Sequence, residues 1–460
     1  MGRLVVVSNR TPVGNPRTGS AGGLAVALGS VLAKRDALWI GWNGEISEMA
    51  EAPVHRRVRR TEIVGFSLTA AQHAGFYTGF ANGTLWPLFH YRLGLMEYRR
   101  SEYAAYLTTN DSIAQLVMSQ IKPGDVLWVH DYHLIPLARA LRRLGVTNRI
   151  GFFLHIPWPA AEVFRSLPVH ADLAEALAHF DLIGFQTETC ASQFRNYLGL
   201  EAAAHGWSHS MYGRHFRAAA FPIGIDTQEF SALAAAASLD GQRLLDNLGN
   251  RALIIGVDRL DYSKGLPNRI AGYGEFLERN PGVRGKVQYL QIAPISRGEV
   301  ANYRALRREL DGLAGRINGK HAEFDWTPLR YVNKGYPRRS LAAFYRLARV
   351  GLVTPLRDGM NLVAKEFVAA QRAEDPGVLL LSEFAGAAAE MTGALKVNPY
   401  DTTAIADLLG KALEMPYDER LSRWRADMDT ITRNTATAWA DTFLGDLLHK
   451  EGDNDEPHKM

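Results

Sequence analysis

Arg259 and Lys264 are two cations five residues apart in the segment DRLDYSKG. The apolar run LIIGV directly precedes this segment, so both side chains belong to a loop that follows a strand. Arginine offers a planar fork of donors and lysine a point charge, and together they suit a diphosphate. The alternative is an ordinary surface pairing of Arg259 with Asp258 or Asp261. We favour the anion site, where the cations would stabilise charge on a leaving phosphate.

The segment RDGMNLVAKE, residues 357–366, combines a strand end with the start of a helix. Asp358 stands at the strand end, and Asn361 opens the helix. Backbone amides at a helix start can hold phosphate oxygens. The Glu366 carboxylate can accept hydrogen bonds from two ribose hydroxyls, whereas the alternative is an exposed helix acid. The whole segment favours a nucleotide site.

The segment SAGGL, residues 20–24, places paired glycines before an apolar helix. Gly22 and Gly23 allow backbone N–H groups to approach an anion at the helix N-terminus. The alternative is an ordinary turn. The string matches neither the dinucleotide fingerprint nor the P-loop.

His130 and His133 are three residues apart after the run VLWV, a spacing that can ligate a metal. No third ligand is evident in the sequence, and no DxD string follows a strand. We therefore interpret both histidines as core or orienting residues, and we expect no metal.

The elements that must position these residues alternate between short apolar runs and amphipathic stretches. The runs predict strands at 4–7, 38–41, 126–129, 151–154, 182–185, 253–257, 287–293, 351–353 and 378–381. Helices are expected at 23–34, 103–118, 297–313 and 362–371. This alternation is typical of an α/β chain with parallel sheets.

Polar residues recur directly after the apolar runs. They are Asn9, Arg10, His130, Asp131, His155, Gln186, Asp258, Arg259, Arg297 and Asp358. In open parallel sheets, ligands bind outside the carboxyl ends of the strands. These side chains therefore predict a site at one edge of each sheet.

The length of 460 residues exceeds what one hydrophobic core usually supports, so two domains are expected. An alanine-rich segment near residues 226–250 separates two strand-rich halves. We predict an N-terminal domain over 1–228, a C-terminal domain over 229–450 and a polar tail over 451–460. The last helix is expected to pack back on the first domain.

Composition excludes several classes of protein. Hydrophobic residues make up 47% and charged residues 22%, as in soluble globular proteins. The one cysteine, Cys190, excludes a disulfide framework and a cysteine zinc cluster. No apolar run reaches bilayer length and the first run is short for a signal peptide, which favours the cytoplasm. The net charge is +4, and the basic run HRRVRR at 55–60 is interpreted as a solvated edge strand or loop rather than a nucleic-acid patch.

Ten strings occur in a fixed order along the chain. They are SNR, SAGGL, LWP-x-FHYR, VHDYHL, GFFLHIP-x-P, GFQTE, RLDYSKGL, SRG, RINGK and TPLRDGMNLVAKE. Together they resemble the bacterial trehalose-6-phosphate synthase family from Arg3 to about residue 445. The resemblance implies the GT-B fold, with two Rossmann-like domains whose parallel sheets face each other across a cleft. It implies transfer of glucose from UDP-glucose to glucose 6-phosphate, with retention, to give α,α-trehalose 6-phosphate and UDP.

Motif by motif, the resemblance implies a role for each candidate residue. The acceptor would be bound by Arg10, Tyr77, Trp86, Asp131 and Arg297. The donor would be bound by Gly22, Gly23, Arg259, Lys264, Tyr336, Asp358, Leu362, Val363, Ala364, Lys365 and Glu366. The catalytic set would be Arg259, Lys264, His155 and Asp358. The departing phosphate would itself accept the acceptor's proton, so that catalysis is mainly positioning and charge stabilisation.

The resemblance also implies no cofactor and no metal, with UDP-glucose as co-substrate. It implies a homodimer or homotetramer, no nucleic-acid or membrane partner, and a separate phosphatase downstream. Three alternatives remain: a same-fold transferase with another phosphorylated acceptor such as glycerol 3-phosphate, an inactive binding homologue, and a pyridoxal-phosphate phosphorylase. Acceptor choice would depend on Tyr77, Trp86 and the 11–18 loop, and the sequence leaves UDP, ADP and GDP open as the nucleotide.

Overall fold

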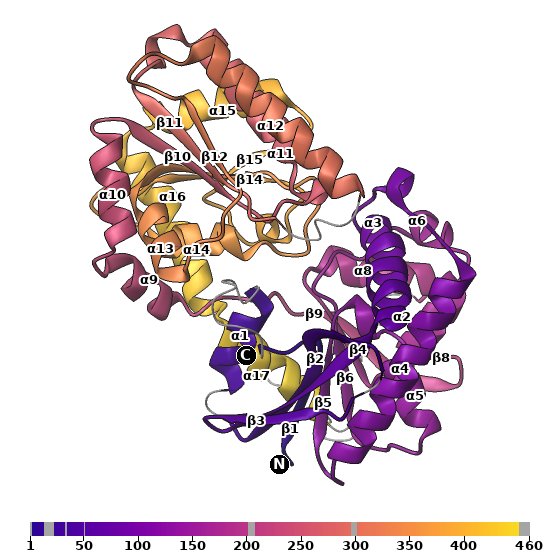
Figure 1. Cartoon of the computed structure of the whole chain (residues 1–460). Helices are drawn as coiled ribbons and strands as arrows, with labels where there is room; N and C mark the ends of the chain where they lie inside the picture. The colour runs from indigo at the N-terminus through magenta and orange to yellow at the C-terminus, as the bar shows by residue number, and fades with distance from the viewer. Residues whose placement is uncertain are drawn as a thin grey trace. The chain divides into compact units, whose positions relative to one another are not determined.

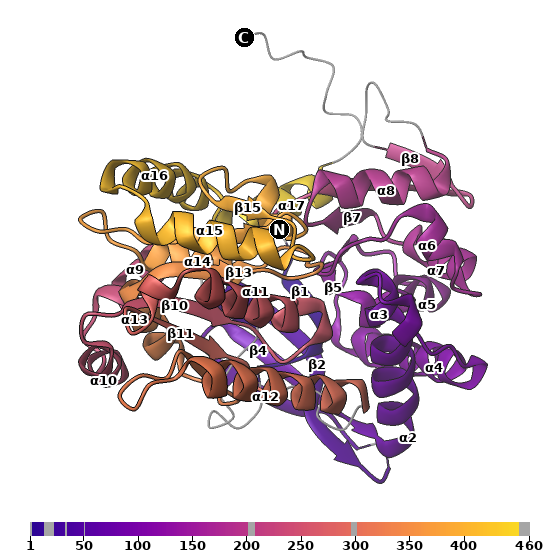
Figure 2. The ribbon, with the colours of Figure 1, turned by 90° about the horizontal axis from the view of Figure 1, so that it is seen from above.

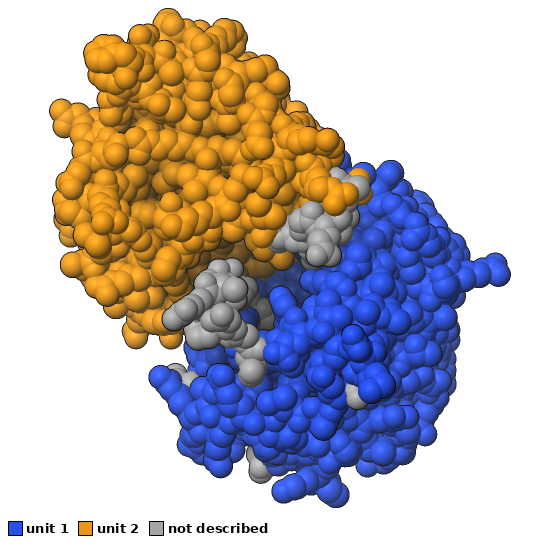
Figure 3. All heavy atoms as spheres, viewed as in Figure 1, with its two compact units in different colours: residues 1–15, 24–223, 436–460 blue, residues 16–23, 224–435 orange. Residues whose placement is uncertain are grey.

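The computed structural model describes residues 2–12, 23–32, 35–49, 51–200, 208–295 and 301–449. The chain divides into two compact units, drawn in different colours in Figure 3. Among the described residues, unit 1 contains the first strand, residues 24–223 and residues 436–449, and unit 2 contains Gly23 and residues 224–435. The division lies at Ile223–Gly224, whereas the sequence placed it at residue 228. The last helix belongs to unit 1.

The described part of unit 1 contains a nine-stranded sheet. Its strands, in spatial order, are β3 (Val54–Val58), β4 (Thr61–Thr69), β2 (Ala37–Ser47), β1 (Leu4–Arg10), β5 (Val126–His130), β6 (Ile150–Phe153), β7 (Leu182–Phe185), β9 (Arg214–Ala220) and β8 (Ser208–Met211). All neighbours are parallel except the two outermost pairs, β3 with β4 and β8 with β9. The central strands are apolar and buried, whereas β3 is exposed along its length. The basic run at 55–60 therefore lies on an edge strand, as interpreted from the sequence.

The helices of unit 1 are α1 (Gly23–Leu32), α2 (Ala70–Gln72), the π-helix η1 (His73–Leu85), α3 (Trp86–Phe89), η2 (Leu93–Leu95), α4 (Arg100–Gln120), η3 (Tyr132–Leu134), α5 (Leu137–Arg143), α6 (Ala161–Arg165), α7 (His170–Leu177), α8 (Glu188–Leu198) and α17 (Ala436–Leu448). Helix α17, yellow in Figure 1, packs against the central strands. A Cβ atom at Gly151 or Gly184 would lie 2.7 Å from the Phe443 ring. Glycine in β6 and β7 therefore makes room for Phe443, and this contact docks the end of the chain on the first sheet.

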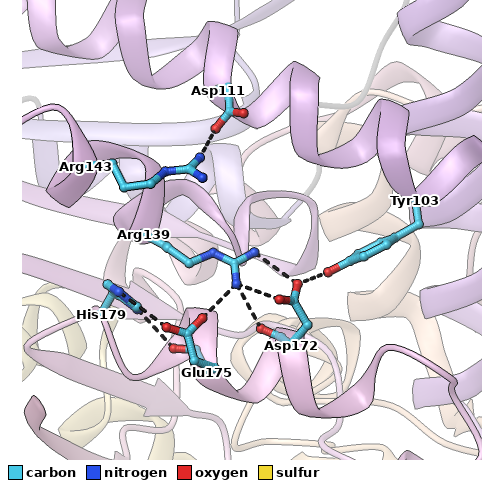
Figure 4. A network of polar contacts seen from close by, with 7 residues as sticks. All are labelled: Tyr103, Asp111, Arg139, Arg143, Asp172, Glu175 and His179. Atoms are coloured by element: carbon cyan, nitrogen blue, oxygen red, sulfur yellow. Dashed lines mark hydrogen bonds and ion pairs between the residues drawn. The ribbon is translucent and has the colours of Figure 1, made fainter. Parts of the chain in front are cut away.

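A polar network fastens α4, α5 and α7 together in unit 1 (Figure 4). Arg139 Nη1 donates to Asp172 Oδ1 over 2.8 Å and to Glu175 Oε2 over 2.7 Å. The Tyr103 hydroxyl donates to the other oxygen of Asp172. Each carboxylate of the network has an arginine partner within unit 1, so we assign the network to helix packing rather than to a binding site.

Unit 2 contains, in its described residues, a six-stranded sheet. Its strands, in spatial order, are β12 (Leu329–Val332), β11 (Val287–Ile292), β10 (Ala252–Val257), β13 (Ala348–Val353), β14 (Val378–Ser382) and β15 (Leu395–Val397). All neighbours are parallel. Such a sheet needs a helical layer on both faces to bury its apolar strands.

Helices cover both faces of the unit 2 sheet (Figure 1, Figure 2). One layer contains α11 (Leu266–Arg279), α12 (Ala301–His321) and α15 (Thr402–Glu414). The other contains α9 (Thr227–Ala235), α10 (Leu239–Leu248), α13 (Arg338–Leu347), α14 (Leu362–Ala370) and α16 (Tyr417–Arg433). Short turns η4 (Tyr262–Lys264), η5 (Pro281–Val283) and η6 (Gly386–Ala389) complete the unit.

The sequence predicted the buried parallel strands, and the structure confirms each of them. It missed strands that are short or partly polar, such as β4, β9, β12 and β15. It also missed η1, because π-helices are rare and the apolar spacing was compared only with that of α-helices and strands. In the described part of the chain, no helix is both long enough and apolar enough to cross a bilayer.

Candidate functional site

In unit 1, polar side chains from three neighbouring strands meet at the carboxyl edge of the sheet. His130 ends β5, His155 follows β6, and Gln186 follows β7. Gln186 Nε2 donates to His155 Nδ1 over 3.4 Å, and His155 Nε2 lies 3.1 Å from His130 Nδ1. The prediction that strand ends bring these residues together is confirmed.

The His155 imidazole is neutral and fixed in orientation. Burial lowers the pKa of His155 to about 3. Because the Gln186 Nε2 amide nitrogen can only donate, His155 Nδ1 accepts, and His155 Nε2 carries the proton that is donated to His130. Gln186 Oε1 in turn accepts the N–H of Ile223 over 3.0 Å. The sequence singled out Gln186 as a strand-end residue but assigned it no role.

Asp131 has a backbone conformation that is rare for a non-glycine residue, with φ 77° and ψ 164°. Its carboxylate accepts the N–H of Tyr132 over 3.1 Å and the N–H of His155 over 3.3 Å. Strain of this kind persists only where surrounding contacts enforce it, and it is concentrated at functional sites. The half-buried carboxylate is thus held beside His155.

Arg10 and Tyr77 come together through a residue that the sequence analysis did not single out, Trp42. The Arg10 guanidinium lies 4.6 Å from the centre of the Trp42 ring. The Tyr77 ring packs on Trp42 at 5.2 Å in an edge arrangement and stacks on His133 at 5.9 Å. Trp42 is a buried aromatic residue inside β2, so a rule that selects polar residues after apolar runs gave no signal for it. His133 is thus an aromatic packing residue in this cluster.

Trp86 is buried rather than open, with 5% of its surface exposed. Its ring lies 4.1 Å from the His90 ring and 5.8 Å from the Tyr132 ring. Its carbonyl oxygen lies 2.8 Å from His90 Nδ1. The structure therefore places Trp86 against the residue that follows Asp131.

In unit 2, the structure joins two predicted residues directly, because Lys264 Nζ forms an ion pair with Asp358 Oδ2. Asn361 Nδ2 donates to the same oxygen over 3.0 Å. Asn361 also caps α14: its φ is 77°, and its Oδ1 accepts the N–H of Ala364 over 3.3 Å. One cluster therefore holds the cation, the carboxylate and the start of the helix.

Arg259 is exposed, whereas the two carboxylates of its loop are buried. Asp258 pairs with Arg269 over 2.8 Å. Asp261 accepts the Tyr303 hydroxyl over 2.9 Å and the Ser263 N–H over 2.9 Å. Both acids thus have partners inside the unit, and Arg259 stands at the surface of the same loop.

Helix α14 carries the remaining predicted donor residues, Leu362 to Glu366. Burial raises the pKa of Glu366 to about 7, against an opposing effect of Arg338. The buried Lys365 ammonium pairs with Glu390, so its side chain is directed into the fold. Helix amides of the first turn have no partner within their own helix, which suits an anion.

Tyr336 and Tyr345 flank the same region of unit 2. The half-buried Tyr336 ring packs at 5.3 Å against Phe344. The Tyr345 hydroxyl is buried and has no hydrogen-bond partner among the described residues. Sequence analysis missed Tyr345, because a tyrosine in an amphipathic helix gives no signal of its own.

Some predicted residues cannot be placed. Gly22 and Arg297 lie outside the described residues, and Gly23 is the first residue of α1. Among the side chains that are described, no group of three or more His, Cys, Asp or Glu is arranged to hold a metal ion.

A cavity of about 400 Å³ lies at the opposite edge of the unit 1 sheet, at the amino ends of β1 and β5. Two arginines line it, and both have acidic partners: Arg3 pairs with Asp125 over 3.2 Å, and Arg35 pairs with Asp441. Ligands of parallel sheets bind at the carboxyl edge, so we place the candidate site at the strand ends rather than in this cavity.

Comparison with known proteins gives a match over almost the whole chain. The model of glycosyltransferase family 20 matches residues 3–449. A trehalose-6-phosphate synthase of Sinorhizobium fredii is 48% identical, with 97% of this chain and 98% of the relative covered. The resemblance drawn from the sequence motifs is thus confirmed.

Solved structures of trehalose-phosphate synthases are similar to this chain over nearly its whole length. An alpha,alpha-trehalose-phosphate synthase (UDP-forming) from Burkholderia xenovorans in complex with glucose-6-phosphate has a TM-score of 0.94 at 45% identity, covering 97% of this chain and 100% of that one. An Escherichia coli structure bound with UDP-2-fluoro glucose has a TM-score of 0.92 at 44% identity, covering 97% and 99%. The predicted fold class, α/β of the GT-B type with two Rossmann-like halves, is confirmed. The chain belongs to glycosyltransferase family 20.

Proposed function

We propose that this protein transfers glucose from UDP-glucose to glucose 6-phosphate and releases α,α-trehalose 6-phosphate and UDP. The observation that carries the proposal is the likeness, over 97% of the chain, to a structure that holds glucose-6-phosphate and to another that holds UDP-2-fluoro glucose. The polar strand ends of unit 1 and unit 2 supply side chains of the types that these two ligands require.

In the proposed reaction, the bond between the glucose C1 and the diphosphate oxygen breaks, and a bond from C1 to the acceptor's anomeric oxygen forms on the same face. The proton of the acceptor hydroxyl passes to the departing phosphate oxygen. Arg259 and Lys264 stabilise the negative charge on that phosphate, which is the main electrostatic contribution. Asp358, paired with Lys264, orients the ammonium and accepts from donor glucose hydroxyls.

Recognition of the acceptor is assigned to unit 1. The Arg10 guanidinium binds the acceptor phosphate, helped by Arg297. Asp131 and Tyr77 bind beside it, and Trp86 and His155 shape the sugar pockets. Since His155 is neutral, it acts through hydrogen bonds and shape rather than through charge.

Recognition of the donor is assigned to unit 2 and to the two glycines at the start of α1. Gly22 and Gly23 approach the diphosphate, and the residues Leu362, Val363, Ala364, Lys365 and Glu366 hold the nucleotide. Leu362 and Val363 act through the main-chain amides of the first helical turn. The Ala364 amide is capped by Asn361 and the Lys365 ammonium pairs with Glu390, so these two residues line the site beside them. The Glu366 carboxylate accepts the ribose hydroxyls, and the main chain at Tyr336 contacts the base.

The test supplies glucose 6-phosphate with UDP-, ADP- or GDP-glucose separately and measures released nucleotide and sugar product. We expect turnover with UDP-glucose and a disaccharide phosphate as product. A second series replaces glucose 6-phosphate with glycerol 3-phosphate, and faster turnover there would support the other-acceptor alternative. Absence of turnover with every pair would favour an inactive binding homologue.

The proposal extends to cofactors and partners. We propose that the reaction needs no metal, so that turnover persists in excess chelator. A requirement for added magnesium or manganese would contradict this. We further propose that the protein acts in the cytoplasm as a homodimer or homotetramer and that a separate phosphatase removes the phosphate from its product.

A further inference from the structure

Arg269, in α11, is completely buried, although its helix begins directly after the loop that carries Arg259 and Lys264. A buried guanidinium is costly unless its donors are satisfied. Here one side chain contacts four separate groups of unit 2. The arrangement of those groups indicates what the arginine does.

The contacts of Arg269 come from three strand ends and from the loop. Nε donates to Thr354 Oγ1 over 2.9 Å, and Nη1 donates to Gln291 Oε1 over 3.2 Å. Nη2 donates to the carbonyl of Lys264 over 3.3 Å. The same nitrogen lies 2.8 Å from Asp258 Oδ2, as an ion pair rather than an aligned hydrogen bond.

These contacts attach the loop 258–264, which carries Arg259 and Lys264, to the sheet at both ends of the loop. Asp258 directly follows β10 and precedes Arg259, and Lys264 is the last residue of η4. Gln291 belongs to β11, and Thr354 directly follows β13. The guanidinium therefore fixes both ends of the loop relative to three adjacent strands.

The backbone next to Lys264 is tightly confined as well. Gly265 has φ 64°, and a Cβ atom there would lie 2.3 Å from the carbonyl oxygen of Thr354. The N–H of Leu356 donates to the Ser263 carbonyl over 2.8 Å. The loop therefore cannot move without moving the strand end that also holds Arg269.

We propose that Arg269 is a positioning residue for the reaction: from inside unit 2 it fixes the loop that presents Arg259 and Lys264 to the leaving diphosphate. This inference rests on the proposed function, because it takes the role of those two cations as given. Arg269 does not itself contact substrate. It acts through the Lys264 carbonyl and through Asp258.

The physical reason is the precision that charge stabilisation requires. A misplacement of about 1 Å in a catalytic group can lower the rate about 100-fold. Asp258 is buried, and burial raises its pKa while Arg269 and Lys264 lower it. Arg269 thus places its positive charge against the Asp258 carboxyl at the start of the loop and donates a hydrogen bond to the Lys264 carbonyl at its far end.

The main test loosens Arg269 without removing it. Thr354→Val deletes the acceptor of Nε with little change in volume, and Thr354→Ser retains it. We expect Thr354→Val to lower kcat about ten-fold or more, with the KM for glucose 6-phosphate unchanged. Thr354→Ser should stay within about two-fold of the wild type.

A second pair of variants separates positioning from folding. Arg269→Lys retains the positive charge but loses the planar set of guanidinium donors. Arg420→Lys makes the same change at another buried arginine, in α16. Arg420 contacts Asp375 and the Met415 carbonyl, near the amino end of β14. Both should lower the thermal midpoint. Only Arg269→Lys should lower kcat per folded molecule, by about 100-fold.

The outcomes separate this inference from the proposed function. Wild-type kcat in both Thr354→Val and Arg269→Lys overturns the positioning role, as does an equal loss of kcat in Arg420→Lys. Lys264→Ala is measured alongside. If Lys264→Ala loses turnover while Arg269→Lys does not, only the positioning inference fails. If Lys264→Ala keeps full turnover, the proposed charge stabilisation itself fails.

Discussion

Lys264 and Asp358 hold each other in a fixed position before a charged ligand binds. The ammonium is already paired with a carboxylate that Asn361 also contacts, so few rotamers remain open to it. Preorganised charge costs little reorganisation when a negative charge develops nearby. Arg259 differs, because its side chain is exposed on the same loop. The two cations therefore differ in how firmly they are held before the ligand binds.

Replacing either cation tests the charge-stabilisation step. We expect Arg259→Ala and Lys264→Ala each to lower kcat by about 100-fold to 1,000-fold, with a smaller loss in affinity for UDP, because the charge acts chiefly in the transition state. Steady-state kinetics and UDP titration calorimetry provide the two numbers. Unchanged turnover in both variants would remove them from the mechanism.

Glu366 provides a prediction with a defined pH range. Its pKa of about 7 means that the carboxylate forms as the pH rises from 6 to 8. A carboxylate is a stronger acceptor of hydroxyl hydrogen bonds than a neutral acid. Affinity for UDP-glucose should therefore increase with pH over this range, by up to about ten-fold.

The matched variants are Glu366→Gln and Glu414→Gln, the latter at an exposed acid at the end of α15. Glu366→Gln should bind UDP-glucose more weakly at pH 8 and lose the pH dependence. Glu414→Gln should behave as the wild type. A pH dependence that persists in Glu366→Gln would assign the titration to another group.

At the scale of secondary-structure elements, α16 is joined to the loop before β15 by a buried acid. Asp427 is 2% exposed, and its Oδ1 accepts the N–H of Gly393 over 2.7 Å. Burial raises the pKa of Asp427 to about 6, although Gly393, Lys396 and Arg423 all act to lower it. The fold thus holds a carboxylate where a neutral group would be more stable.

Asp427→Asn should therefore stabilise the protein at neutral pH. The folded pKa of about 6 is higher than the usual 3.8, so the wild type loses stability as the pH rises from 3.8 to about 6, while the amide variant does not. We expect a gain on the order of 2 kcal/mol at pH 7.5 that shrinks towards pH 4.5. Thermal midpoints at both pH values provide the measurement, and a gain that is constant with pH would contradict the assignment.

At the scale of the whole molecule, the described chain beyond Leu24 passes between the two units at Ile223–Gly224 and again at Thr435–Ala436. On the unit 2 side, the residues next to these points lie together. The Thr227 hydroxyl donates to the Ile431 carbonyl over 2.9 Å, and a Cβ atom on Gly224 would lie 1.7 Å from the carbonyl oxygen of Asn434. Glycine at 224 is therefore required by a close backbone approach.

Gly224→Ala should accordingly destabilise the protein by at least about 2 kcal/mol, because backbone must shift to admit the methyl group. Gly410→Ala, inside α15, is the control, since its Cβ would meet only Phe276 at 3.8 Å. That change should be neutral or stabilising by up to about 1 kcal/mol, from helix propensity. Thermal midpoints that fall equally in both variants would contradict the steric argument.

The sequence alone determined the fold class and the chemical types at the strand ends. Buried parallel strands are read from continuous apolar runs because both of their faces lie against helices. Their carboxyl ends meet at one edge, so Lys264 and Asp358, or His130 and His155, could be grouped before any coordinates were known. The sequence did not predict short and partly polar strands such as β12 and β15, because a run of three or four residues that includes a charged one resembles a loop.

Only the tertiary structure decided which side chains support the site from within. Arg269 looks in the sequence like a surface residue of an amphipathic helix, yet it is buried between three strand ends. Gln186 fixes His155, and Trp42 joins Arg10 to Tyr77, through contacts between residues far apart in the chain. Periodicity reports which face of an element is apolar, whereas the partner of a buried polar group depends on how elements from distant segments pack together.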